Sequence, residues 1–131
     1  MNYRDIASGF VEAALWSSAN PDYCGDDDAP EFLDGVDAGL APGQEFRLGL
    51  VATRWARDNR KLAEQGIEAL ENSQHTGEEL LGHNLWLTAH SHGVGFWDRG
   101  LGDLGDDLTK AAQKLRERNG YVGDDGHVYF D

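Results

Sequence analysis

The hydrophobic positions at the start of the chain repeat with a helical period. Residues 2–16 place Ile6 and Phe10 four apart, with further apolar residues at helical spacing, so this segment is predicted to be an amphipathic helix. The next segment, residues 17–43, is rich in Pro, Gly and Asp, which favour turns. It is predicted to be mostly loop, with one short helical turn near Phe32–Leu33.

A second apolar stripe runs through residues 42–72, in a segment rich in Arg, Ala, Leu and Glu. Its spacing predicts a long amphipathic helix in which Gly66 is the candidate break. Thr76 followed by Glu79 matches a capping box, in which the threonine hydroxyl accepts from the backbone three residues further on. This motif predicts the start of a short helix that runs through Leu81.

The pattern changes after Gly82. Residues 84–90 alternate between two sets of side chains, which is typical of a strand, and residues 94–97 are its predicted hairpin partner. Residues 103–119 return to helical spacing and end at an Asn-Gly pair, a common helix stop. Asp125-Gly126 lies between two β-favouring stretches and predicts a second hairpin.

Together these elements predict an α+β protein, with N-terminal helices packed on a small antiparallel β-sheet formed by the C-terminal half. Residues 1–131 are expected to form a single domain, because 40% hydrophobic residues in a chain of this length suffice for one core. Residues 1–81 are predicted to be mainly helical, with an acidic loop over 17–45. Residues 82–131 are predicted to supply a β-hairpin, a helix and a β-hairpin.

Cysteine content and hydropathy narrow the expected cellular setting. The one cysteine, Cys24, excludes an internal disulfide framework and suits a reducing compartment. No run approaches the ~18 apolar residues of a transmembrane helix, and the first residues lack the basic-then-apolar layout of a signal peptide. We therefore expect a cytoplasmic protein without membrane contact.

The net charge says more about the expected partners than any motif in the sequence does. The chain has 24 Asp and Glu against 11 Lys and Arg, a formal net charge of −13. Such a molecule repels nucleic acid and anionic lipid, so its expected partners are basic protein surfaces. The alternative is that the acidity only keeps a small protein soluble. Basic residues gather on the first half of the second predicted helix, at Arg47, Arg54, Arg57, Arg60 and Lys61.

The acidic residues fall into sets. No basic residue occurs between residues 17 and 46, and the candidate partner-binding residues in this stretch are Asp26, Asp27, Asp28, Glu31, Asp34 and Asp37. A second candidate set, spaced i, i+4 and i+7 and so expected to line one helical face ~5–6 Å apart, is Glu64, Glu68 and Glu71. Duplex DNA presents one phosphate charge per ~1.7 Å of axis, so closely spaced carboxylates could occupy a basic groove made for DNA.

The stretch HSHGVGFWDRG, residues 90–100, is the chief alternative site. On a strand, His90 and His92 would share a face and offer two zinc ligands, whereas a structural zinc site needs four ligands and a catalytic site three. Ser91 has poor geometry for pairing with either as nucleophile and base. The GLGDLG pattern that begins at Gly100 matches a dinucleotide fingerprint in spacing, but the aspartates in and after it would repel a pyrophosphate. We therefore predict a turn here, with Phe96 and Trp97 packed in the core, and no metal, cofactor or catalytic residue.

The C-terminal half resembles a family of small acidic proteins encoded by phages and prophages. The resemblance covers about Gly82–Phe130 and rests on GFWDRG followed by YVGDDG, while WLTAHSHG departs from the family's pattern by replacing a basic-Asn pair. Small acidic phage proteins include anti-CRISPR proteins that block DNA binding by occupying a basic DNA channel. The resemblance implies no catalytic residues.

The leading hypothesis is therefore a phage-encoded inhibitor of anti-CRISPR type in the host bacterial cytoplasm. Its acidic surface would mimic DNA and cover the basic DNA-binding surface of a CRISPR surveillance complex, without binding nucleic acid itself. Two alternatives stay open. One is an acidic phage accessory protein that binds another basic host protein, such as a restriction or nucleoid protein. The other is a small His-based module that binds a metal or ligand.

Overall fold

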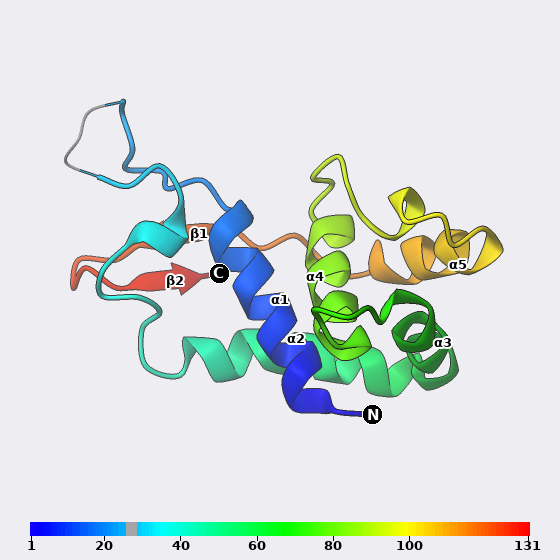
Figure 1. Cartoon of the computed structure of the whole chain (residues 1–131). Coiled ribbons are helices and arrows are strands. Elements are labelled where there is room, and N and C mark those ends of the chain that lie inside the picture. Colours follow the sequence, from blue (N-terminus) through cyan, green and yellow to red (C-terminus); the bar gives the residue numbers. More distant parts are fainter. Residues whose placement is uncertain (26–28) are drawn as a thin grey trace.

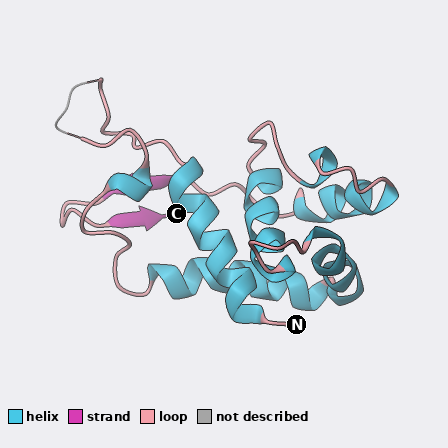
Figure 2. Ribbon diagram, in the orientation of Figure 1, coloured by secondary structure: helices cyan, strands magenta, loops and turns pink. Residues whose placement is uncertain are grey.

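The computed structural model describes residues 1–25 and 29–131 (Figure 1). Helices dominate, and two short strands near the C-terminus form the sheet (Figure 2), which confirms the predicted α+β class. In chain order the elements are α1 (Tyr3–Ser17), the 3-10 turn η1 (Leu33–Gly35), α2 (Gln44–Asp58), α3 (Arg60–Leu70), α4 (Gly77–Ala89), the 3-10 turn η2 (Phe96–Asp98), α5 (Asp103–Ala112), β1 (Gly120–Val122) and β2 (Val128–Phe130). Among the described helices, none has both the length and the apolar character needed to cross a membrane.

Helices α1 and α4 cross with their backbones in close approach. A Cβ added to Gly9 would overlap the carbonyl of Glu79, and one added to Gly82 would overlap the carbonyl of Ile6 and lie 2.7 Å from the Phe10 nitrogen. Glycine is therefore required at both positions, because any side chain would push two backbones apart. Ile6 and Phe10 are fully buried, so the predicted apolar face of α1 points into the core beside this crossing.

Trp86 of α4 joins the helices to the sheet. Its side chain is fully buried, and its ring meets the edges of Phe10 at 5.3 Å and of Phe130 at 5.6 Å between centroids. Its indole nitrogen Nε1 donates a hydrogen bond of 2.9 Å to Ser17 Oγ at the end of α1. One side chain therefore ties α4 to α1 and to β2, with its polar atom satisfied as a buried indole requires.

The predicted strand over residues 84–90, and with it the hairpin to residues 94–97, is wrong. The Thr76 cap is confirmed, since its hydroxyl accepts from the Glu79 backbone at 3.1 Å, but the helix it starts runs past Leu81 to Ala89. Residues 84–89 are all buried. A helix covered on every side has no single apolar face, so its sequence loses the helical period and can alternate by coincidence.

Two other predicted helices have different ends. The long helix predicted over residues 42–72 is two helices, α2 and α3, which meet at Asn59. The side-chain nitrogen of Asn59 donates to the Trp55 carbonyl at 2.9 Å. Gly66, the predicted break, lies inside α3. An asparagine that bonds the last turn in this way competes with the helical backbone and ends the helix. The helix predicted over 103–119 ends earlier, at Ala112.

The second predicted hairpin is confirmed. Strands β1 and β2 are antiparallel, with Tyr121 opposite Tyr129, and Gly126 has the positive φ of +83° that the turn requires. The backbone of Val128 also bonds the segment before α2, donating to the Gly39 carbonyl at 2.8 Å and accepting from Ala41 at 2.9 Å. The hairpin is thereby fixed against the chain that leads into α2.

Candidate functional site

Six of the nine predicted partner-binding carboxylates can be placed. Asp26, Asp27 and Asp28 lie outside the described residues. All the others are exposed: Glu31, Asp34 and Asp37 lie on or beside η1, Glu64 and Glu68 lie on α3, and Glu71 follows the last residue of α3. The predicted place of Glu71 on the same helical face is wrong, because its backbone has left the helix with a ψ of 135°. All six are therefore accessible to a partner, as the hypothesis requires.

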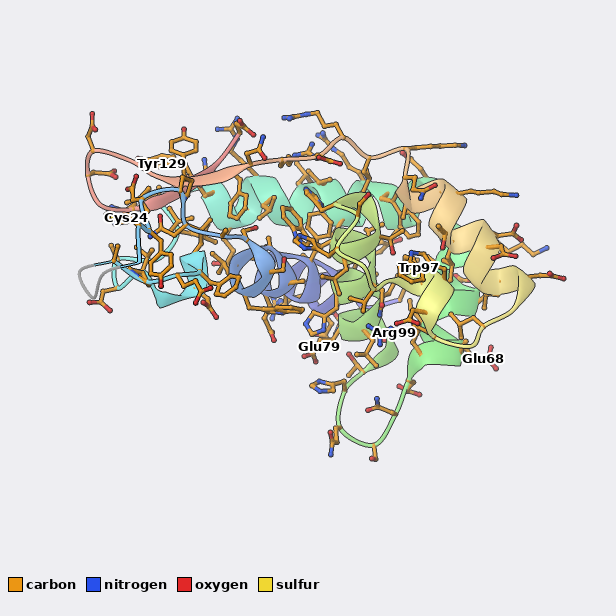
Figure 3. The ribbon with its side chains drawn as sticks, turned by 90° about the horizontal axis from the view of Figure 1, so that it is seen from above. Cys24, Glu68, Glu79, Trp97, Arg99 and Tyr129 are labelled. Atoms are coloured by element: carbon orange, nitrogen blue, oxygen red, sulfur yellow. The ribbon has the colours of Figure 1, made fainter. Side chains whose placement is uncertain are left out.

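The two acidic sets do not form one surface. In Figures 1 and 3 the segment around η1 lies at one end of the molecule, near Cys24, and α3 with Glu68 lies at the other. The loop of the C-terminal hairpin, which exposes Asp124 and Asp125, lies at the same end as η1 (Figure 1). We call this the loop–hairpin end, defined by Glu31, Asp34, Asp37, Asp124 and Asp125.

The α3 set has acidic neighbours that the sequence did not assign to it. Glu68 and Asp107 line one shallow hollow between α3 and α5, together with Gln65, Ala69 and Leu104. We call this the α3–α5 surface. Asp103, Asp106 and Asp107 are exposed in the first turns of α5, where the helix dipole favours negative charge.

Basic side chains reduce the net negative charge of the α3–α5 surface. Glu64 Oε1 lies 3.0 Å from Arg60 Nε, and this hydrogen bond raises the pKa of the arginine. Lys61 and Lys110 are also exposed on α3 and α5. The loop–hairpin end is the more uniformly acidic of the two, since residues 17–46 include no Lys or Arg.

Basic side chains gather along α2. Two hollows beside this helix are lined by Arg47 and Arg54 from α2 and by Arg116 and Arg118 from the segment after α5, and Lys114 lines one of them. Burial, and next the charge of Arg116, lower the pKa of Arg118. Arg47 and Arg54 thus have basic neighbours from the C-terminal half. Charge is partly segregated on the molecule, since Asp131 lines one of the two hollows and Asp58 the other.

Residues 90–100 hold the scaffold together and do not bring two histidines to one strand face. His90 stacks on Trp86 with ring centroids 3.5 Å apart; its Nδ1 lies 2.9 Å from the Trp86 carbonyl, and its Nε2 accepts from the Arg118 backbone N–H at 2.9 Å. Both nitrogens are therefore engaged. Burial is the main cause that lowers the pKa of His90. His92 is exposed.

The rest of this stretch follows the predicted turn in part. Phe96 is buried and its backbone N–H donates to Thr88 Oγ1 at 3.1 Å, but Trp97 is 48% exposed, so its predicted place in the core is wrong. Arg99 Nε donates to Asn84 Oδ1 at 2.9 Å and ties the loop to α4. Asp103 is the first residue of α5, as its predicted helical range has it, and Gly102 takes the cap position.

One cluster with metal-ligand chemistry was missed by the sequence analysis. Glu12 of α1 and Glu79 and His83 of α4 bring a ligand atom each to within 4.8 Å of one another. Glu79 and His83 are four residues apart, a spacing that puts two side chains on one helix face. The signal was hidden because the predicted helix ended at Leu81 and the predicted strand began at residue 84.

Comparisons of this chain with protein-family models, with curated proteins and with solved structures give no match.

Proposed function

We propose that this protein is an inhibitor of anti-CRISPR type, which covers the basic DNA-binding surface of an RNA-guided complex in the host bacterial cytoplasm. The observation that carries the proposal is the charge distribution: a formal charge of −13, with exposed carboxylates gathered at the loop–hairpin end. A protein surface that holds duplex DNA presents rows of Lys and Arg, which such a surface complements. The phage-family resemblance of residues 82–130 supports the choice of a defence system as target.

The loop–hairpin end is the contact surface that we favour. Its five carboxylates are exposed, and three of them follow one another within seven residues around η1. Carboxylates gathered at one end of the molecule add their fields and attract a basic partner that approaches this end. The α3–α5 surface is the second choice because Arg60, Lys61 and Lys110 reduce its net charge.

A mobility-shift assay of RNA-guided surveillance complexes on cognate duplex DNA tests this function. Protein added before the DNA should abolish the shift, and rising salt should relieve the inhibition, because ion release drives the contact. The variant Glu31→Gln/Asp34→Asn/Asp37→Asn should inhibit at least ~10-fold less well, a loss of about 1.4 kcal/mol over three charge pairs of 0.2–1 kcal/mol each.

Two matched variants show whether the loss is specific. Glu64→Gln/Glu68→Gln/Glu71→Gln removes the same charge from the other end and should have the smaller effect. Arg47→Gln/Arg54→Gln should leave inhibition unchanged or stronger. DNA mimicry is wrong if neutralising both acidic sets leaves inhibition intact, and an undisturbed shift with wild-type protein points to another basic host protein.

A further inference from the structure

We propose that Glu12, Glu79 and His83 form a binding site for a divalent transition-metal ion of the zinc type, at the crossing of α1 and α4. The site is separate from the acidic surfaces above, and its occupancy does not depend on the proposed inhibitor function. It would take one ion through one imidazole nitrogen and two carboxylates.

The glycine contact between the two helices places the three side chains. Glu12 follows Gly9 by three residues on α1, and on α4 Glu79 precedes Gly82 by three residues while His83 follows it directly. Because both glycines lie against the opposite backbone, the side chains at one edge of the crossing are held close. Figure 3 shows Glu79 on α4 beside α1.

The donor atoms are near the arrangement that a metal needs. His83 Nε2 lies 3.5 Å from Glu12 Oε1, and the three ligand atoms lie within 4.8 Å of one another. Ligands at 2.0–2.1 Å from a tetrahedral zinc ion stand roughly 3.4 Å apart. One contact already has that spacing, and the other ligand atoms need to move by at most about 1.4 Å, which side-chain rotation supplies while both helices stay in place.

One ring nitrogen of His83 has no hydrogen-bond partner among the described residues. His83 Nε2 is buried and, within the described part of the chain, accepts and donates no hydrogen bond; the 3.5 Å contact with Glu12 lacks the required geometry. A buried polar atom without a partner is costly, and two neighbouring carboxylates repel each other. A dication bound among the three groups would remove both costs.

His75 supports the site from outside. Its Nδ1 lies 3.2 Å from Glu79 Oε1, and its ring lies 6.4 Å from that of His83. Metal-binding carboxylates are commonly held by such hydrogen bonds, which orient them and tune affinity. We assign His75 as a positioning residue, with Glu12, Glu79 and His83 as the ligands.

The donor set predicts selectivity. An imidazole with two carboxylates suits zinc and its first-row neighbours, whereas calcium and magnesium prefer sites made of oxygen alone. Three protein ligands leave a coordination position for water or a small anion, as in open zinc sites. The acidic surfaces attract any cation, whereas this site should bind zinc and not calcium. A comparison of zinc with calcium therefore distinguishes the site from the acidic surfaces.

Calorimetric titration of chelator-treated protein with zinc, and separately with calcium, tests the proposal. We expect one zinc per chain, no matching calcium isotherm, and a rise in Tm with zinc. Glu12→Gln should weaken zinc binding at least ~10-fold and His75→Gln by a similar factor. Glu12 is 56% exposed at its side chain, so this variant is expected to fold, which circular dichroism checks.

His92→Ala and Glu68→Gln are the matched controls, since they remove an exposed histidine and an exposed carboxylate elsewhere. Both should bind zinc as the wild type does. The proposal is overturned if zinc binds below one equivalent, if folded Glu12→Gln binds zinc unchanged, or if calcium binds with the same stoichiometry and affinity.

Discussion

The substitution Gly82→Ala tests whether the α1–α4 crossing depends on glycine. The added methyl would overlap the Ile6 carbonyl and stand 2.7 Å from the Phe10 nitrogen and 3.1 Å from the Gly9 carbonyl carbon. All three are backbone atoms, which cannot rotate away as a side chain can. The helices must therefore separate by roughly 0.7 Å or more. A gap of that size loses about a quarter to a half of the attractive dispersion energy of each atom pair across the crossing.

Two opposing effects set the expected magnitude. Alanine favours a helix over glycine by about 1 kcal/mol, whereas overpacking in a core costs about 1–3 kcal/mol, and a backbone clash belongs at the upper end. We expect a net loss of about 2 kcal/mol in the free energy of unfolding. The buried contacts of Ile6 and Phe10 are those that weaken.

Urea unfolding followed by tryptophan fluorescence measures this loss. With a slope of about 2 kcal/mol per molar urea, the midpoint should fall by about 1 M at unchanged slope. Gly66→Ala is the matched control: it is also a buried helical glycine, but its added Cβ would meet only side-chain methyl groups, of Leu81 at 3.1 Å and Leu108 at 3.3 Å. The control should stay within about 0.5 kcal/mol of wild type. If Gly82→Ala unfolds at the same midpoint as the control or above it, the crossing is not governed by glycine contact.

Two further predictions concern polar groups at the ends of α1 and α4. Ser17→Ala removes the acceptor of the Trp86 Nε1 bond and should cost about 1–3 kcal/mol in thermal or urea unfolding, because a buried indole N–H is left unpaired, whereas Ser18→Ala next to it should cost less. Burial lowers the pKa of His90 below its unfolded value, so the unfolded state takes up the proton first; this contribution to stability is complete above the unfolded pKa and is lost as the pH falls toward the lower folded value. Urea midpoints measured from pH 7.5 to pH 5 should fall with pH, and the fall should be smaller in His90→Asn; an identical pH dependence in the two proteins would remove His90 as its source.

The parts of the fold predicted correctly are those determined by neighbours in the sequence. Each of these features involves residues within four positions of one another. They are the i, i+4 spacing of Ile6 and Phe10, the Thr76 cap and the Asp125-Gly126 turn. Helix α4 was mistaken for a strand because its environment, and not its own sequence period, determines which side chains are buried. Trp86 illustrates this, since its covering partners Phe10 and Phe130 come from the two ends of the chain.

The candidate sites divide in the same way. Exposure of the acidic residues could be expected from charge alone, and the i, i+4 spacing of Glu64 and Glu68 on α3 is correct. The hollow shared by Glu68 and Asp107 depends on how α3 packs against α5, and the approach of Glu12 to His83 depends on the crossing of α1 with α4. Neither can be read from local pattern, because each needs a tertiary contact between distant segments.

The α1–α4 crossing also fixes an order of events during synthesis of the chain. Its bonds join residues far apart in sequence: 69 positions separate Ser17 from Trp86, and 76 separate Asn2 from Glu78. Closing a loop of that length costs roughly 4 kcal/mol of chain entropy, and an isolated helix as short as α1 is marginal in water. At a ribosomal rate of about 5–20 residues per second, the apolar face of α1 waits roughly 4–14 s for α4 to be made. The stripe that contains Ile6 and Phe10 therefore emerges before the helix that crosses it at Gly82, and it lacks that part of its cover until Trp86, 69 positions after Ser17, has been translated.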